Sequence, residues 1–195
     1  MQMAFDCGQY ADALKIARNY LKKVDAYDWD AMIMEAHVLS LPHPKFCDYF
    51  RAIGIAHFAL NHDRTDARRW AGLARVFYDC GIHNEAERCY RTALNIDPHN
   101  DAAIIGLCAL EAERHPDVGI PTAELKNLLE GSIARGSDDW ALYLYLARIV
   151  RAEGDKTKAI QMYESAMQRC ADKVSHQARE EFEKEVEALR QEIGR

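Results

Sequence analysis

The sequence has no block of lysines and arginines that could hold a nucleic acid or an anionic membrane. Its 25 basic side chains are scattered among 31 acidic ones, and the formal net charge is -6. A protein with this charge is not attracted to phosphate backbones or to acidic lipid headgroups. Nucleic acid is therefore not an expected partner.

Long hydrophobic runs are also missing. The longest, such as ALYLYLA at 141–147, are far shorter than the roughly 20 residues that cross a bilayer. The first ten residues, MQMAFDCGQY, lack the basic and apolar regions of a signal peptide. We expect no membrane insertion, and a cytoplasmic location for the chain as given.

The six cysteines form no CxxC pair, so we expect them to be reduced and mostly buried. They are not expected to form the disulfides that stabilise small domains. His43 and Cys47 come closest to a metal-ligand spacing, but Pro42 and Pro44 argue against a regular helical pair there. No nucleophile elbow, phosphate loop, HExxH pair or dinucleotide-binding glycine pattern is present. The sequence thus predicts no metal, no cofactor and no enzyme.

What is present favours helices. Leu, Ala, Arg and Glu outweigh the β-branched residues, and charges of both signs are mixed along the chain. From Gly81 the chain reaches Ala86, Tyr90, Ala93 and Pro98 by steps that reappear after Gly154 and, in part, after Gly8. A glycine between two helices relieves the left-handed backbone at the end of the first one, and small residues let the second pack closely.

Residues 67–100 resemble a complete tetratricopeptide repeat of about 34 residues. The positions that carry the resemblance are Trp70, Leu73, Ala74, Phe77, Gly81, Ala86, Tyr90, Ala93 and Pro98. The resemblance implies an all-α fold, a tetratricopeptide-type α-solenoid in which antiparallel helix pairs form a right-handed superhelix. Either Asp63 or Thr65 is expected to cap the helix that starts near Ala67.

The repeat spacing predicts an array over 1–173, followed by an amphipathic capping helix over 174–195. The array divides into a partial repeat (1–27), a long one (28–66), the complete one (67–100), a second long one (101–139) and a last one (140–173). In the capping helix, Val174, Ala178, Phe182, Val186, Leu189 and Ile193 share one stripe. A coiled-coil partner site is the alternative use of that stripe.

The amino end starts where the first helix of a repeat should be half complete. The apolar face toward Ala13 and Ala17 is therefore expected to be uncovered. A neighbouring copy of the chain, in a homo-oligomer, or a preceding domain would then cover it.

The resemblance also implies that the first helix of each repeat lines a concave groove. The residues that fall on its exposed positions are Arg68, Ala71, Arg75, Tyr78, Asp79, Ile105, Leu144, Arg148 and Arg151. An apolar floor between arginines suits a peptide that carries an acidic residue, because a guanidinium can hold a carboxylate by two bonds. The alternative is that these arginines are solvated or pair with nearby acids such as Asp79.

Members of this family that bind chaperone tails use a clamp of lysine, asparagine and arginine. Here those places hold Ala71 and Arg75, then Gly106, then Ala141 and Tyr145, so the clamp pattern is absent. The favoured function is a non-catalytic adaptor or interaction module that binds a peptide segment in the groove. Two alternatives stay open: an assembly subunit that uses its ends or convex face, and a chaperone for a client protein.

Overall fold

The computed structural model describes residues 10–42, 47–62, 64–115, 123–170 and 176–193, and every regular element within these ranges is an α-helix. The helices are α2 (Tyr10–Lys23), α3 (Trp29–Ser40), α4 (Tyr49–His62), α5 (Ala67–Asp79), α6 (His83–Ile96), α7 (Asp101–Arg114), α8 (Ala123–Ala134), α9 (Trp140–Ala152), α10 (Lys156–Cys170) and α11 (His176–Ile193). They fall into two compact units, Met1–Gly106 and Leu107–Arg195.

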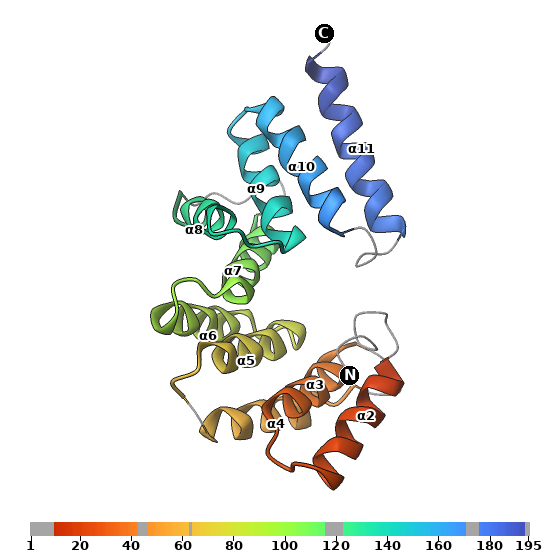
Figure 1. Cartoon of the computed structure of the whole chain (residues 1–195), viewed down its shortest axis with the longest axis vertical. Coiled ribbons are helices and arrows are strands. Elements are labelled where there is room, and N and C mark those ends of the chain that lie inside the picture. Colours follow the sequence, from red (N-terminus) through yellow and green to blue (C-terminus); the bar gives the residue numbers. More distant parts are fainter. Residues whose placement is uncertain (1–9, 43–46, 63, 116–122, 171–175, 194–195) are drawn as a thin grey trace. The chain divides into compact units, whose positions relative to one another are not determined.

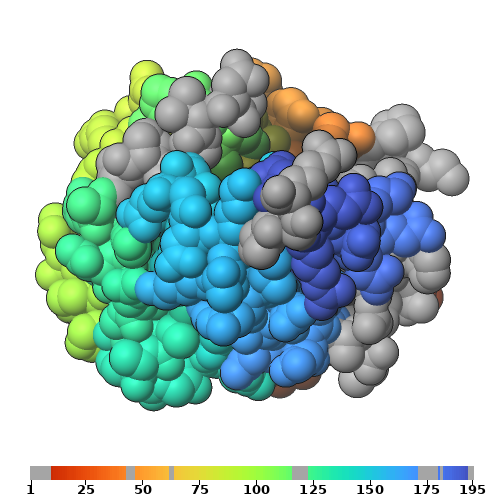
Figure 2. Space-filling view, turned by 90° about the horizontal axis from the view of Figure 1, so that it is seen from above, coloured from red at the N-terminus to blue at the C-terminus, as the bar shows by residue number. Residues whose placement is uncertain are grey.

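In the first unit, each helix from α2 to α6 packs on the next, and α3 also packs on α5 (Figure 1). In the second unit, α9 packs between α8 and α10, and α10 packs on α11. Figure 2 shows the surfaces of α10 and α11 in two shades of blue, lying side by side. Each unit is thus a series of helices packed on their chain neighbours.

Two glycines at the hairpin turns have the predicted left-handed backbone. Gly81 has φ 74° and Gly154 has φ 90°. At the first turn, the Ile82 N–H donates to the Phe77 carbonyl at 2.9 Å and the Gly81 N–H donates to the Tyr78 carbonyl at 2.9 Å. These two bonds form a Schellman motif, which satisfies carbonyls at the end of α5. The prediction that glycine relieves strain at these turns is confirmed.

Small and apolar residues at the repeat positions form the cores. The complete repeat buries Leu73, Ala74, Phe77, Ala86, Tyr90 and Ala93, and the last repeat buries Tyr143, Leu146, Ala147, Val150, Ala159, Tyr163 and Ala166. In the long repeats, small and apolar residues of α4 and α8 are also buried: Ala52, Ala56, Ala59, Leu125, Leu129 and Ser132. Trp70 is only partly buried, because its indole Nε1–H reaches back to the Arg64 carbonyl at 2.8 Å.

The expectation of an uncovered face at Ala13 and Ala17 is wrong. Both are fully buried, and with Leu14 they pack in one cluster with Met34 and Val38 of α3. The apolar residues that α2 leaves exposed lie on another face: Ile16, Tyr20 and, just beyond its end, Val24. Tyr20 stands where the repeat steps counted from Gly8 place a tyrosine, and it is therefore not a core residue.

A buried carboxylate ties α2, α3 and α4 together. Glu35 is 5% exposed, and its Oε1 accepts from Arg18 Nε of α2 at 2.9 Å and from Arg51 Nη2 of α4 at 2.9 Å. A carboxylate leaves water at low cost only when charged donors surround it. The two arginines thus allow α3 to bury an acidic residue in an otherwise apolar helix.

The predicted stripe of α11 is buried where the structure describes it. Phe182, Val186 and Leu189 are shielded from solvent, and the Phe182 ring lies 6.1 Å from the Trp140 ring at the start of α9. Val174 lies outside the described residues, as do the side chains of Ala178 and Ile193. The described part of the stripe packs within the chain, which leaves less of it for a coiled-coil partner.

Candidate functional site

The predicted groove residues of the complete repeat lie on α5. Four of them carry polar groups, and we call Arg68, Arg75, Tyr78 and Asp79 the α5 polar face. Arg68 and Arg75 are exposed, whereas Tyr78 and Asp79 are partly buried. The face therefore presents two guanidinium groups on one helix.

Arg75 and Asp79 form an ion pair one helical turn apart. Arg75 Nε lies 2.9 Å from Asp79 Oδ1, and Ser40 of α3 donates its hydroxyl to Asp79 Oδ2 at 3.2 Å. The Asp79 side chain is 8% exposed and that of Arg75 is 53% exposed. The carboxylate is thus held from two helices, and it fixes a guanidinium that still reaches solvent.

Aromatic rings continue this arrangement toward the start of α6. The Arg75 guanidinium carbon lies 5.8 Å from the centre of the Tyr78 ring, and that ring stacks on His83 at 5.8 Å. A cation near an aromatic face gains about 0.5–1 kcal/mol at an exposed site. The ring pair and the carboxylate together restrict where Arg75 can point.

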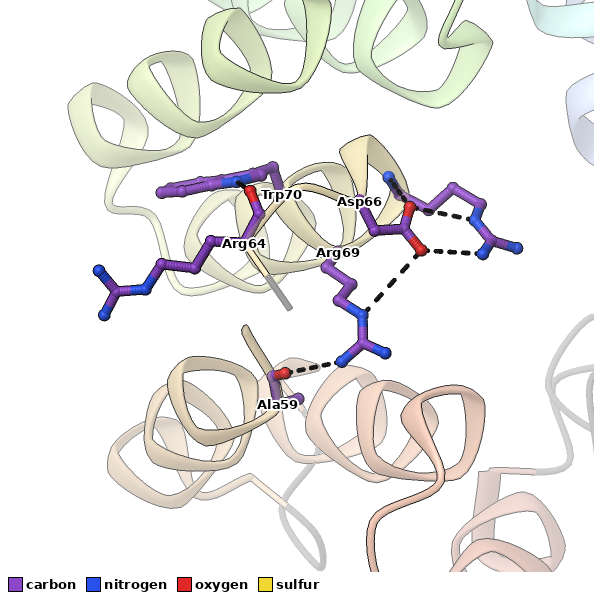
Figure 3. A network of polar contacts seen from close by, with 6 residues as sticks. Ala59, Arg64, Asp66, Arg69 and Trp70 are labelled. Atoms are coloured by element: carbon purple, nitrogen blue, oxygen red, sulfur yellow. Dashed lines mark hydrogen bonds and ion pairs between the residues drawn. The ribbon is translucent and has the colours of Figure 1, made fainter. Parts of the chain in front are cut away.

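A second network surrounds Asp66 at the junction of α4 and α5 (Figure 3), and the hydrogen bonds of Arg68 to Asp66 make Arg68 part of it. Asp66 caps α5 by accepting from the Arg68 N–H at 2.9 Å, and its two oxygens accept from Arg68 Nη2 at 2.8 Å and Nε at 3.2 Å. Those contacts lower the pKa of Asp66, the side-chain hydrogen bond from Arg68 most of all. The cap predicted at Asp63 or Thr65 is therefore Asp66.

The adjacent Arg69 holds the two helices together. Its Nη1 donates to the Ala59 carbonyl near the end of α4 at 3.0 Å, and its guanidinium carbon lies 5.2 Å from the centre of the Trp29 ring (Figure 3 shows the first contact). The bond to Ala59 satisfies a carbonyl in the last turn of α4. Arg69 is thus a structural residue, whereas its neighbour Arg68 faces solvent.

Two predicted groove residues are not exposed. Ala71 is 4% exposed. At the adjacent position of α5, which packs on α3, a Cβ built on Gly72 would lie 2.9 Å from side-chain atoms of Trp29 and Ile33. Leu144 is 6% exposed in α9, which α8 and α10 both cover. The prediction that these two side chains line an open surface is wrong. Ile105, in α7, is partly buried.

The two predicted arginines of α9 also have internal partners. The Arg148 guanidinium carbon lies 5.8 Å from the centre of the Tyr145 ring, and Arg151 Nη1 lies 3.5 Å from Glu185 Oε2 of α11. Burial, together with the smaller effect of Glu185, raises the pKa of the nearby Tyr163 to about 12. Arg151 thus helps to fasten α11; it is exposed, whereas Arg148 is partly buried.

The sequence did not predict that residues of α3 contact the α5 polar face. His37 lies beside the Arg75 and Asp79 pair, and burial lowers the pKa of His37 to about 4, against the opposite effect of Asp79. The signal was three polar residues, Glu35, His37 and Ser40, within the apolar stretch WDAMIMEAHVLS. Polar residues in a buried helix need partners, so each marks a contact with another element.

Other site types were sought in the described part of the chain. No group of three or more His, Cys, Asp or Glu side chains there is arranged to hold a metal ion. Among the same residues, no helix is both long and apolar enough to cross a membrane.

Solved structures share this fold. Yeast Tom70 matches with a TM-score of 0.70 and 19% identity over 98% of this chain, which spans 39% of the Tom70 chain. A crystal structure of MamA matches with a TM-score of 0.54 and 12% identity, covering 86% of this chain and 92% of MamA. MamA from Desulfovibrio magneticus RS-1, from residue 41 to its end, gives a TM-score of 0.50 at 13% identity and 96% coverage of both chains.

No protein-family model matches the sequence, and no curated protein is similar to it at a significant level. The structural similarities therefore identify the fold alone: the chain is all-helical and has a tetratricopeptide-type α-solenoid architecture.

Proposed function

We propose that this protein is a non-catalytic interaction module, and that the α5 polar face binds an acidic peptide segment of a partner protein. The fold favours this role, because stacked helical repeats present extended surfaces to other proteins. Fold alone does not determine function, so the proposal depends on the chemistry of the face.

The observation that carries the proposal is the fixed position of Arg75. Its Nε binds Asp79, which is itself anchored by Ser40, and half of the arginine side chain is open to solvent. A guanidinium has five N–H donors in a rigid fork, so the ion pair leaves donors for a second carboxylate. An arginine held in place loses less side-chain entropy on binding than a mobile one.

Arg68 supports the proposal as a second exposed cation on the same helix. Its side chain is 77% exposed although it pairs with Asp66. Exposed ion pairs contribute about 0–1 kcal/mol, so a partner's acid can compete for this guanidinium.

The experiment is a quantitative capture of partners from a cell extract by immobilised protein. Arg75→Glu should lose partners that the wild type retains. Arg91→Glu is the matched control: Arg91 is also 53% exposed and also pairs through Nε with an acid one turn away, Glu87, at 3.1 Å, but it lies on α6. If the two variants lose the same partners, the loss reflects overall charge and the α5 proposal fails.

A second candidate function has its own observation. Ile16, Tyr20 and Val24 follow one another at helical spacing and are 43%, 39% and 69% exposed. Tyr27, three residues after Val24, stacks on Phe58 of α4 at 6.1 Å between ring centres. Exposed apolar strips of this kind are typical of assembly contacts. We therefore retain an assembly subunit as the alternative.

Light scattering coupled to size-exclusion chromatography tests this alternative for self-association. Ile16→Lys with Tyr20→Lys should convert an oligomer to a monomer, whereas the exposed neighbour Asn19→Lys should not. If the wild type is monomeric at micromolar concentration, self-assembly through this strip is excluded.

A further inference from the structure

A row of basic side chains lies beside the apolar strip of α2. The strip consists of Ile16, Tyr20 and Val24, and the Val24 N–H continues the helical bonding by donating to the Tyr20 carbonyl at 2.8 Å. Lys23 follows Tyr20 by three positions and therefore lies next to it, and Lys15 lies two turns before Lys23 in the same row. Both lysines are exposed.

The other edge of the strip borders the core of the first unit. Ala13 and Ala17, which form the next row on that side, are fully buried, and α2 packs mainly on α3 (Figure 1). The strip thus lies between a packed edge and a charged one. A helix that covers it would meet the two lysines along one side.

These lysines are unneutralised cations on an acidic protein. Within the described ranges neither Lys15 nor Lys23 forms an ion pair, whereas Arg18 Nε of the same helix lies 2.9 Å from Glu35 Oε1. The one acidic residue of α2 is Asp12, although the whole chain has a formal net charge of -6. The surface beside the strip is therefore positive, and it is complementary to acids.

We propose that α2 binds an amphipathic helix of another protein, whose apolar stripe covers Ile16, Tyr20 and Val24 and whose acids face Lys15 and Lys23. The two lysines are eight residues apart, which is about 12 Å along the helix axis. The partner helix therefore carries two acids about two turns apart, next to its apolar stripe. An apolar helix face with charges along its edge is a common mode of recognition between helices.

A second copy of this chain offers no such helix. Among the described helices, α4 exposes Phe50 and Phe58 but contains no acidic residue, and α2 has a single acid. The acidic α11 packs its described apolar stripe within the chain. Two copies of α2 placed strip to strip would bring like charges together, which disfavours that pairing.

An anionic membrane is also a poorer occupant than a helix. Basic clusters that hold proteins on anionic lipid contain about four to eight lysines or arginines. The row beside the strip has two lysines, and the nearby Arg18 is already paired with Glu35. The proposal deepens the assembly alternative, on which it rests, and it does not depend on the α5 polar face.

The test measures the Kd of the full chain for labelled synthetic helices by fluorescence anisotropy. The acidic probe has roughly 18 residues, enough to be helical in water, with leucines along one face and two glutamates two turns apart beside them. A second probe has lysines in place of the glutamates. The wild type should bind the acidic probe and not the lysine probe, and Lys15→Glu with Lys23→Glu should reverse this preference.

Lys23→Glu alone should weaken binding of the acidic probe roughly 10-fold, since an attraction becomes a repulsion. Lys22→Glu is the matched control: Lys22 is also exposed and directly precedes Lys23, but it lies one row further from the strip, so the Kd should change less than about threefold. Ile16→Ala with Tyr20→Ala should lose the probe. Circular dichroism checks that all variants are equally helical.

Arg75→Glu should leave the Kd of the acidic probe unchanged, so this proposal and that of the α5 polar face fail separately. The present proposal is overturned if the acidic probe does not bind, or if Lys22→Glu and Lys23→Glu weaken it equally. Dimerisation of the wild type through the strip, or binding of phosphatidylserine vesicles in place of the probe, would also overturn it.

Discussion

Arg75 Nε lies 2.9 Å from Asp79 Oδ1, and the same carboxylate accepts the Ser40 hydroxyl from the neighbouring α3. One acid thus serves two purposes: it orients an arginine toward solvent, and it joins the first helices of two successive repeat segments. Binding and stability are therefore coupled at this residue.

Asp79→Asn should weaken both effects. The amide keeps the shape but loses the charge that Arg75 and Ser40 share, so we expect the free energy of unfolding to fall by about 1–3 kcal/mol. Because the Arg75 guanidinium is then no longer held by a charged partner, an acidic partner should bind more weakly than to the wild type. Urea denaturation and a binding titration on the same sample check both; undiminished partner binding in a folded variant would show that Asp79 does not position Arg75 for binding.

Gly106→Ala should destabilise the first unit. A Cβ at this position in α7 would overlap the Tyr90 ring of α6, and Tyr90 is buried with no room to move away. Overpacking of this kind costs about 1–3 kcal/mol. Gly54→Ala in α4 is the control, because nothing lies within 4 Å of its added Cβ.

Gly54 is exposed in its helix, so alanine there should leave the free energy of unfolding unchanged or raise it by up to about 1 kcal/mol. The measurement is urea denaturation of the two variants side by side. Equal stabilities would mean that α7 does not pack against Tyr90 as closely as described.

Stability should depend on pH through His37. Its pKa is about 4 in the folded protein against an ordinary value of 6.5, so the unfolded state binds the proton more readily. The contribution of neutral His37 is complete above pH 6.5 and is lost as the pH falls toward 4, by on the order of 2–3 kcal/mol.

His37→Gln removes this titration, so the variant should lose less stability than the wild type between pH 7 and pH 4.5. Urea denaturation across that range provides the comparison, and the carboxylates that titrate at lower pH are the same in both proteins. Parallel pH profiles would show that folding does not lower the pKa of His37.

Glu35→Gln should cost more than the loss of a local surface ion pair. Glu35 accepts from arginines of two other helices and is almost fully buried, so we expect a loss of about 1–3 kcal/mol. The matched change Glu87→Gln removes a pair within α6 and should cost less than about 0.5 kcal/mol. Similar costs for both changes would contradict a joining role for Glu35.

The sequence predicted the helices of the complete repeat well, because glycine, alanine and aromatic positions there obey one steric pattern. Gly81 and Tyr90 have the predicted backbone and burial. The pattern fixes which side of a helix packs on its own partner, so the burial of Ala86 and Ala93 in α6 was predicted as well.

The candidate site was less predictable, since exposure depends on helices that are distant in sequence. Ala71 occupies a groove position by spacing, yet its side chain is buried. The partners of Arg75 include Ser40, and no spacing rule connects a residue of α3 to one at the end of α5. Contacts of this kind can be identified only from a structure that gives the positions of both helices.

The central claim is that Arg75 binds an acidic residue of a partner, and the most direct measurement is the Kd of a captured partner segment for two variants. Fluorescence anisotropy with the labelled segment should give a Kd at least about 30-fold weaker for Arg75→Glu, since truncating one partner of a bound charge pair costs about 2 kcal/mol or more. Arg91→Glu should stay within about threefold of the wild type. Equal weakening in both variants, or none in Arg75→Glu, would contradict the account.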